Sequence, residues 1–524
     1  MAITFELYTG KANGVSAPSQ KPNTAYLKAS EWDDYSYKTI FALVVFDSNG
    51  DRHNIGSVKI GKIAQDIGWT ADLIKDKRFN KLDEGFFSLG QSEEYYSTIQ
   101  ALEPNLRKNI LNSLHDVVHH EELLSKVMNE DVFKSSLLRD TSSTSILGQF
   151  KRILQGGDIQ TEFHFKYAIP QGPRTAGLEL EFHVDPESNP PSNVHVLIGR
   201  NGVGKTHLLN NMVKALVADD ESVKKVGEFS IPLDEDGLPY NIEESETLFS
   251  GVVSVAFSAF DPFEPYPEKR DKSQGIRYSY IGLKRATNRG GEKGTPMSRD
   301  MLTNEFVKSM LASVTMGKLE RWLEAIKSLE SDSLFRDLSL SKEFVEYEGE
   351  ELEAFARRTF NRMSSGHAIV LLTITKLVEK VEEKTLVLLD EPEAHLHPPL
   401  LSAFVRALSE LLSHRNGVGI IATHSPVILQ EVPRSCVYKM SRSGLKATPQ
   451  RPQIETFGEN VGVLTREIFG LEVSNSGYHK LLEKELEQRR SYKRILRQFD
   501  GQLGSEAKGI LRSLIIAMEN EVDQ

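Results

Sequence analysis

The chain has 524 residues, 39% of them hydrophobic, which is enough for two or three packed domains. Its net charge of −11 excludes a global basic field that attracts nucleic acid, so any such contact needs a local patch. Its single cysteine, Cys436, excludes an intramolecular disulfide and a cysteine-rich zinc site and favours a cytoplasmic location. We find no signal-peptide pattern at the start and no apolar stretch of membrane-spanning length.

The first 60 residues predict a β-rich region. Apolar runs at Thr39–Phe46 and Asn54–Ile60 indicate two strands joined by a tight hairpin turn. We expect Asn49 and Gly50 at the centre of this turn, both with positive φ, because these residue types favour such turns.

Residues 61–155 have mostly helical spacing, including one long helix over Asn105–Asn129. His115 and His119 lie four residues apart in this helix and could share a metal ion. A solvated helix face is the preferred interpretation, because no third ligand is evident.

A glycine-rich segment, Gly199–Thr206, follows two antiparallel strands and an apolar strand at Val194–Ile198, and a helical pattern follows it. Strand, GxxxxGK[ST] and helix form the P-loop arrangement, in which backbone N–H groups surround phosphate oxygens. Lys205 can reach the β- and γ-phosphates, and the Thr206 hydroxyl can hold Mg²⁺. The candidate residues for binding ATP are Gly199, Asn201, Gly202, Gly204, Lys205 and Thr206.

The middle of the chain has two segments of biased charge. The acidic stretch Asp219–Glu246 predicts a solvated insertion. Residues 264–300 look like a basic loop, in which Lys284 and Arg285 follow two tyrosines. Aromatic rings between cations can bind single-stranded nucleic acid, but neighbouring carboxylates make a solvated loop the stronger alternative. After this loop, core-like spacing predicts helices over residues 303–332.

An apolar run at Thr385–Leu389 ends in Asp390 and Glu391 and predicts a strand buried on both faces of a parallel sheet. The carboxyl ends of such strands are where α/β proteins bind ligands. Asp390 is placed to position Mg²⁺, and Glu391 is placed to polarise an attacking water as a general base. A later strand, Gly419–Thr423, delivers His424 to the same edge, where a sensor of the γ-phosphate would sit.

The segment Ser364–His367 precedes a long apolar helix. Ser365 and Gly366 offer a hydroxyl, free N–H groups and the positive end of a helix dipole, all of which suit a phosphate. A serine that simply caps the helix is the alternative.

Together these motifs resemble the ABC-type ATPases of the SMC, Rad50 and RecF kind. The resemblance assigns Walker A to Gly199–Thr206, a divergent signature motif to Ser364–His367 and Walker B with its catalytic glutamate to Leu386–Glu391. It assigns the D-loop to Glu393–Pro398 and the switch histidine to His424. It implies an α/β head with a mostly parallel sheet, flanking helices and an antiparallel β-subdomain, with helical insertions and a helical C-terminus.

The string Asp390–Pro398, with Ala422–Pro426, is similar to the branch containing the overcoming-lysogenization-defect (OLD) nucleases and the ATPase subunits of anti-phage systems. No Toprim pattern follows residue 440, and helices over Tyr478–Gln498 and Ala507–Val522 are predicted instead. The length, the β-plus-helical N-terminal region and the Toprim-free C-terminus look most like the ATPase subunit of Septu defence systems, including retron-associated versions. The resemblance implies an HNH nuclease partner and, in retron versions, a reverse transcriptase and its DNA product. The glutamine of the Q-loop is not visible after residue 257.

We therefore expect a β-plus-helical region over 1–157, an ATPase head over 158–445 with an insertion at about 218–350, and a helical region over 446–524. The leading hypothesis is an ATP-hydrolysing homodimer or higher homo-oligomer, without membrane contact, that controls a nuclease in anti-phage defence. The alternatives are a RecF-like DNA-repair ATPase that binds DNA directly and a scaffold in which ATP is bound with negligible turnover.

Overall fold

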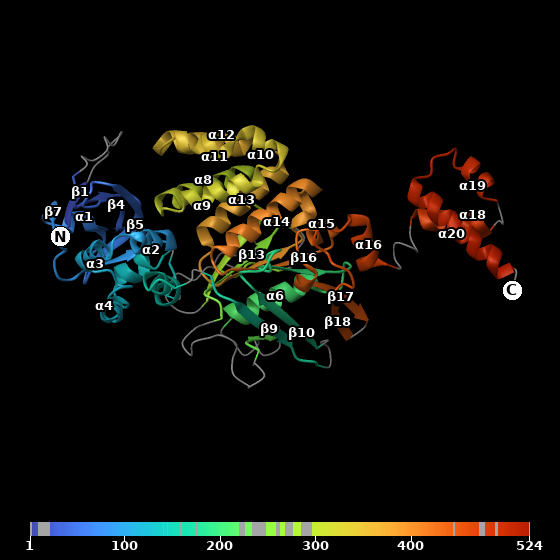
Figure 1. Ribbon diagram of the computed structural model, residues 1–524, viewed down its shortest axis with the longest axis horizontal. Helices are drawn as coiled ribbons and strands as arrows, with labels where there is room; N and C mark the ends of the chain where they lie inside the picture. Colours follow the sequence, from blue (N-terminus) through green and yellow to red (C-terminus); the bar gives the residue numbers. More distant parts are fainter. Residues whose placement is uncertain are drawn as a thin grey trace.

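The computed structural model describes residues 3–8, 21–139, 141–143, 145–157, 160–172, 177–218, 226–232, 248–257, 263–267, 276–284, 296–443, 446–470, 477–487 and 491–522. Most of the acidic stretch 219–246 and most cations of the segment 264–300, including Arg285, lie outside these residues, as does the position expected for the Q-loop residue. Figure 1 shows an elongated molecule with an N-terminal sheet region, a central layered body and a small helical unit at the C-terminus.

The central body is built on a seven-stranded sheet in the order β14-β13-β15-β16-β11-β17-β18. All neighbouring pairs are parallel except β17 with β18, so the expected mostly parallel sheet is confirmed. Its strands are β11 (Val194–Ile198), β13 (Gly251–Ala256), β14 (Arg277–Gly282), β15 (Thr385–Asp390), β16 (Val418–Thr423), β17 (Val437–Ser443) and β18 (Lys446–Gln450).

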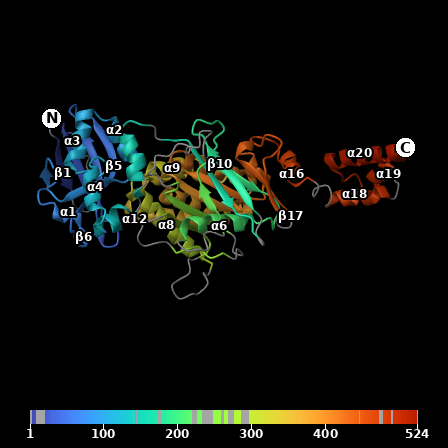
Figure 2. The ribbon, with the colours of Figure 1, turned by 90° about the horizontal axis from the view of Figure 1, so that it is seen from below.

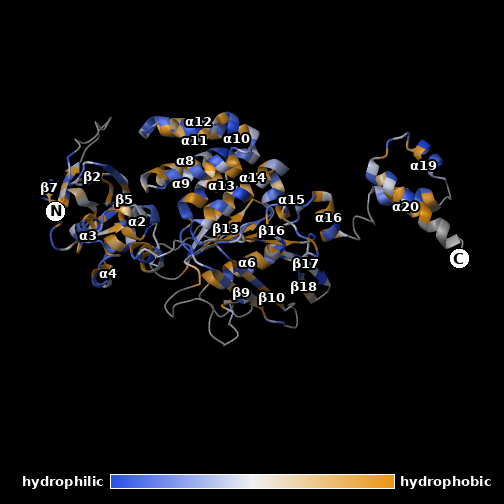
Figure 3. Ribbon diagram, in the orientation of Figure 1, coloured by the Kyte–Doolittle hydropathy of each residue, from blue (hydrophilic) through white to orange (hydrophobic). Residues whose placement is uncertain are grey.

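Two cores cover the two faces of this sheet because side chains alternate along each strand. On one face, Val387 and Leu389 of β15 pack with the long helices that include α13. On the other face, Leu386 and Leu388 pack with α6 and the antiparallel subdomain. Figure 3 shows hydrophobic residues on the sheet and on the helices that cover it. The fold is that of an α/β P-loop ATPase.

Different segments of the chain cover the two faces of the central sheet. The helical face contains α8 (Arg299–Thr315), α9 (Leu319–Leu329), α10 (Ser333–Leu338), α11 (Leu340–Glu343), η3 (Phe344–Glu346), α12 (Gly349–Arg362), α13 (Ser365–Lys380), α14 (Pro398–Ser413) and α15 (Pro426–Leu429). The opposite face contains α6 (Lys205–Val217) and the three-stranded sheet of β9 (Phe163–Ile169), β10 (Leu178–Val184) and β12 (Glu228–Ser230). The predicted antiparallel pair β9–β10 is confirmed.

The N-terminal region is a second sheet with its own core. Its order is β7-β1-β2-β4-β5-β8, from β1 (Thr4–Tyr8), β2 (Thr24–Ala29), β4 (Ile40–Phe46), β5 (Arg52–Lys62), β7 (Arg78–Phe79) and β8 (Phe86–Gly90). A small pair is formed by β3 (Tyr37–Lys38) and β6 (Gly68–Trp69). The helices are α1 (Thr70–Leu73), α2 (Glu93–Ala101), α3 (Pro104–Ser113), α4 (Glu121–Val127), η1 (Phe133–Leu137), η2 (Ser145–Phe150) and α5 (Lys151–Leu154).

The C-terminal unit lies apart from the central body in both ribbon views (Figures 1 and 2). It contains α18 (Tyr478–Glu487), α19 (Tyr492–Gln498) and α20 (Ser505–Val522), which share a small core. An exposed ion pair between Arg466 and Glu506 links it to α16 (Val461–Phe469). The single helix predicted over 478–498 is wrong, because Ser491 has extended backbone and begins a separate helix.

The predicted hairpin β4–β5 is confirmed, but its turn differs from the expectation. Gly50 has a positive φ of 84°, whereas Asn49 does not have positive φ. The Asp47 carboxylate accepts hydrogen bonds from the N–H groups of Asn49 and Asp51. This side chain therefore stabilises the turn, and only one left-handed residue is needed.

The long helix predicted over 105–129 is two helices, α3 and α4, and the histidines lie in the turn between them. His115 has a positive φ of 52° and its Nδ1 lies 3.0 Å from the Phe86 carbonyl oxygen. The intervening Asp116 is buried and accepts from the Tyr96 hydroxyl and from backbone N–H groups. Burial raises the pKa of Asp116 to about 7. The solvated helix face predicted here is therefore wrong.

The segment 264–300 also differs from the predicted loop. Residues 277–282 form β14, and Tyr278 is buried in the core with α6. The Lys284 ammonium donates to the Phe263 carbonyl.

No helix of the described residues is long and apolar enough to cross a membrane. The boundaries at 157/158 and 445/446 stay predictions.

Buried ion pairs fasten the N-terminal sheet region to the central body. Arg415, which follows α14, is buried against Glu93 and Glu94 of α2. Arg152 of α5 pairs with the buried Glu383 at 2.7 Å. Arg415, Glu93 and Glu383 are buried, whereas Glu94 and Arg152 are partly exposed, so removing the partner of a buried member leaves its charge without compensation.

We expect Arg415→Ala to lower the free energy of unfolding by about 3–5 kcal/mol, because Glu93 keeps a buried, unpaired charge. Arg357→Ala is the control, since Arg357 forms an exposed pair with Glu353 and should cost at most about 1 kcal/mol. Urea unfolding measures both. Equal losses of unfolding free energy in the two variants would show that the buried pair stabilises the protein no more than the exposed pair does.

Candidate nucleotide-binding site

The P-loop connects the end of β11 to the start of α6. Gly202 and Gly204 have positive φ values of 82° and 98°, which glycine adopts without strain. A Cβ at Gly202 would meet nothing within 4 Å, so the loop leaves room for a ligand there. A Cβ at Gly199 would lie 2.4 Å from the Met440 carbonyl oxygen of β17, so this position needs glycine. Asn201 is exposed in the same turn.

Lys205 is buried at the first position of α6. Its Nζ donates to the carbonyl oxygens of Gly199 at 2.9 Å and Arg200 at 3.2 Å. The ammonium group therefore contacts the first residues of the P-loop. Burial lowers the pKa of Lys205, and the carboxylates of Glu391 and Asp390 oppose this shift. A cation with lowered hydration is well suited to an anionic phosphate.

Thr206 and Asp390 meet although they are far apart in the sequence. The Thr206 hydroxyl donates to Asp390 Oδ1 at 3.2 Å. The contact forms because β16 alone separates β11 from β15, and the strands end at the same edge. A hydroxyl and a carboxylate side by side are the oxygen donors that Mg²⁺ prefers, so these residues fit the ion.

Glu391 follows Asp390 in a left-handed conformation, with φ 46° and ψ 56°. Its N–H donates to the Ala422 carbonyl at 2.9 Å, which fixes the turn against β16. Its side chain is 33% exposed and lies 3.8 Å from His424 Nδ1. The strained backbone of this residue aims its carboxylate out of the sheet edge, where it can act on a ligand.

His424 and its loop are held by Glu393, a residue to which the sequence analysis gave no individual role. Glu393 Oε1 accepts from the Thr423 hydroxyl at 2.5 Å and from the His424 N–H at 2.8 Å. The same oxygen lies 3.2 Å from His424 Nδ1. Glu393 belongs to η4 (Pro392–His395). Its closeness to Asp390 and Glu391 in the sequence is the feature from which a role at this site could have been predicted.

Ser365 and Gly366 lie on the helical face, at the start of α13, where Ser364 is the N-cap. A Cβ at Gly366 would lie 2.5 Å from the His395 carbonyl oxygen, so α13 and η4 touch at this point. Among the described residues, no hydrogen bond joins Ser365 or Gly366 to Gly199–Thr206. The fold thus gathers the predicted P-loop residues, Asp390, Glu391 and His424 at one edge of the sheet, whereas Ser365 and Gly366 lie at the start of α13 and contact η4.

Comparison with known proteins agrees with this geometry. The chain is 43% identical to "Protein ea59" of Escherichia phage lambda over 518 residues, which cover 95% of this chain and 96% of that protein. The chain belongs to the ea59 family. Within this member of the ea59 family, residues 312–430 also match the family model described as "AAA domain, putative AbiEii toxin, Type IV TA system".

Solved structures similar to this ea59-family chain include an ATP-binding cassette of an ABC transporter in its ADP conformation. It is 13% identical, with a TM-score of 0.32, over 60% of this chain and 98% of that one. Another is an Smc head bound to the C-terminal winged-helix domain of ScpA, with 10% identity and a TM-score of 0.27 over 56% and 98% of the two chains. The assignment of the fold rests on the sheet order and the P-loop, not on these scores.

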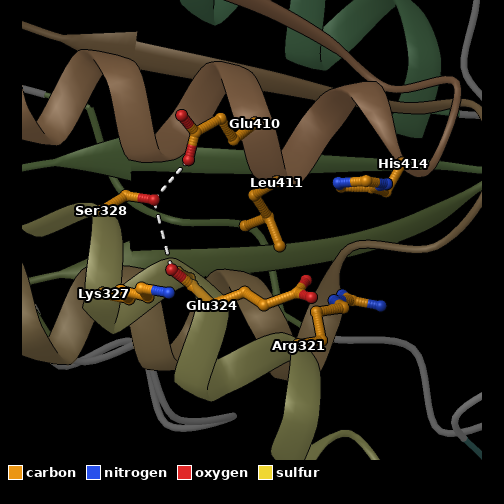
Figure 4. Close-up of a pocket in the computed structure, with 8 residues that line it drawn as sticks. Arg321, Glu324, Lys327, Ser328, Glu410, Leu411 and His414 are labelled. Atoms are coloured by element: carbon orange, nitrogen blue, oxygen red, sulfur yellow. Dashed lines mark hydrogen bonds between the residues drawn. The ribbon is translucent and has the colours of Figure 1, made fainter. Parts of the chain in front are cut away.

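A separate cavity of about 380 Å³ lies between α9 and α14 of the ea59-family chain (Figure 4). The Ser328 hydroxyl of α9 is within hydrogen-bonding reach of the Glu410 carboxylate of α14, across the cavity, and of the Glu324 carbonyl in its own helix. None of the predicted nucleotide-site residues lines this cavity. Its walls carry both acidic and basic groups, so it gives no preference for one ligand charge.

We expect Glu393→Ala to lower the free energy of unfolding by about 1–3 kcal/mol, because the Thr423 hydroxyl and the His424 N–H lose their shared acceptor. Glu393→Gln keeps an acceptor oxygen and should lose less. Thermal and urea unfolding of both variants measure the difference. Equal losses would contradict the anchoring role of this carboxylate.

Proposed function

We propose that this ea59-family chain binds ATP at Gly199–Thr206 and hydrolyses it. The observation that carries this proposal is the Thr206–Asp390 contact, which brings the P-loop and the strand-end carboxylates to one edge of the sheet. Lys205 would bind the phosphates, exchanging its two carbonyl partners for phosphate oxygens. Thr206 and Asp390 would hold Mg²⁺, which when bound offsets the charge of the phosphates.

Glu391 is the proposed general base. Its carboxylate is partly exposed at the edge next to the P-loop, and its left-handed backbone is fixed by the hydrogen bond to Ala422. A base in this place would accept a proton from a water molecule as the water attacks the terminal phosphate of ATP. His424, on the neighbouring strand, is proposed to orient Glu391 and to contact the terminal phosphate, with Glu393 holding the histidine loop.

We further propose that two copies of the chain complete each site. Ser365 and Gly366 lie at the N-terminus of a 16-residue helix, which suits a phosphate, and no hydrogen bond among the described residues joins them to their own P-loop. In this proposal they bind the nucleotide of a second copy. ATP would then hold a homodimer together, and hydrolysis would release it.

The proposed cellular role is control of a separate nuclease in anti-phage defence. This step rests on the resemblance of the motif string to the ATPase subunits of anti-phage systems, and of the length, the β-plus-helical N-terminal region and the Toprim-free C-terminus to the Septu ATPase subunit. It predicts an HNH-type nuclease as the partner and, in a retron version, a reverse transcriptase with its DNA product. Co-purification from the native host followed by mass spectrometry tests it, and recovery of the ATPase without a nuclease would count against this role.

The hydrolysis proposal predicts distinct effects for two variants. Lys205→Ala should abolish ATP binding, whereas Glu391→Gln should bind ATP normally and lower kcat by at least about 100-fold, because only the base is lost. Lys214→Ala, at the other end of α6, is the matched control and should resemble the wild type. Equilibrium binding and phosphate release measure these effects. Unchanged turnover in Glu391→Gln would overturn the role of Glu391.

If two copies complete each site, ATP turnover should return when two inactive variants are mixed. Lys205→Ala and Ser365→Arg should each be inactive alone, but a mixed dimer contains one intact composite site. Mixing equal amounts should therefore restore up to about one quarter of wild-type turnover, since half of the dimers are mixed and each has one working site. No recovery, although the mixture with ATP contains dimers by light scattering, would show that each copy contains its whole site.

A further inference from the structure

Three side chains that can bind a metal meet where α10, α13 and α14 begin. Asp332 is the N-cap of α10, His367 lies in the first turn of α13, and His397 is the N-cap of α14. One ligand atom from each lies within 4.8 Å of the others. Asp332 and His367 are buried, whereas the side chain of His397 is 51% exposed. The cluster is thus held rigidly on one side and open on the other.

The distances in this cluster suit a small divalent ion. Asp332 Oδ1 lies 3.1 Å from His367 Nε2, and Asp332 Oδ2 lies 3.6 Å from His397 Nε2. Ligands about 2.0–2.1 Å from a tetrahedral zinc ion are about 3.3–3.4 Å apart, which is close to both of these carboxylate–histidine distances. Two histidines and one carboxylate form a ligand set that zinc uses with water in the fourth position.

The surroundings of His367 also suit a ligand. Ser364 Oγ lies 2.7 Å from His367 Nδ1, so the other ring nitrogen faces Asp332. A histidine that binds a metal usually forms such a hydrogen bond through its second nitrogen, which fixes the orientation of the ring. The same serine caps α13, and the ligand is therefore positioned by the helix itself.

Two features of the site oppose a cation and limit its affinity. His397 Nδ1 accepts a long hydrogen bond of 3.4 Å from the Leu400 N–H, which would be lost when Nε2 binds a metal and Nδ1 carries the proton. The positive ends of three helix dipoles also point toward the cluster. The Asp332 carboxylate, with a side chain only 3% exposed, offsets this field.

We propose that Asp332, His367 and His397 bind one Zn²⁺ ion. The ion ties the first turn of α13 to the segment that leads from η4 into α14, the two segments that already touch through Gly366 and the His395 carbonyl. It fixes their separation whether or not nucleotide is present. The site does not share a residue with the proposed ATP and Mg²⁺ site, so each can fail without the other.

The test uses the full chain, stripped of metal with a chelator and titrated with Zn²⁺ in the absence of nucleotide. We expect one Zn²⁺ per chain by elemental analysis after dialysis, and Co²⁺ in its place should give the visible absorption of a tetrahedral site. His397→Ala should weaken Zn²⁺ binding by at least about 100-fold, because it removes a direct ligand. Because the His397 side chain is partly exposed, this variant should fold as the wild type does, and Asp332→Asn provides a second variant.

Two matched variants locate the ion. His395→Ala changes an exposed histidine two residues from His397, and His424→Ala removes the histidine beside Glu391 and Glu393. Both should keep one Zn²⁺ with wild-type affinity. Unchanged binding in His397→Ala and Asp332→Asn would overturn the proposal, as would loss in His424→Ala or no stoichiometric binding by the wild type.

Discussion

The parallel pairing of β11, β16 and β15 is the constraint on which the rest of the site depends. In this register Ile198 lies opposite Thr423, and Ala422 lies opposite Asp390. The three strands therefore end together, and the residues that follow them converge: the P-loop after β11, Glu391 after β15 and His424 after β16. A shift of one residue in either pair would turn the buried side chains to the wrong face and separate Thr206 from Asp390.

Charge at this edge is arranged around one buried cation and several carboxylates. Lys205 is held by backbone carbonyls, and the nearby Asp390, Glu391 and Glu393 favour its charged form against burial. An anionic phosphate next to these carboxylates would be repelled without Lys205, the N-terminus of α6 and a divalent ion. The positive charge of Lys205 therefore has to offset the negative charge of the strand-end carboxylates before a phosphate can bind beside them.

The helical face brings a second set of residues close to the same edge. Asp332, His367 and His397 come from three helix starts, and Gly366 allows α13 to approach η4. The segment after Glu391 is therefore in contact with the first turn of α13. The buried Arg415 and Glu383 hold the N-terminal region against the central body.

The sequence alone determined the elements whose signals are local. The Gly199–Thr206 spacing and the apolar strands before it and before Asp390 specified a P-loop in a parallel sheet, because a buried strand and a glycine turn leave a direct pattern. The break at His115 and the strand β14 were missed, since a buried Asp116 and a sheet neighbour overcame local propensity. Only the tertiary structure decided that Glu393 holds His424, that Asp332 meets two histidines and that Gly366 packs against the His395 carbonyl oxygen. Those relations depend on how distant elements pack, and no spacing along the chain encodes them.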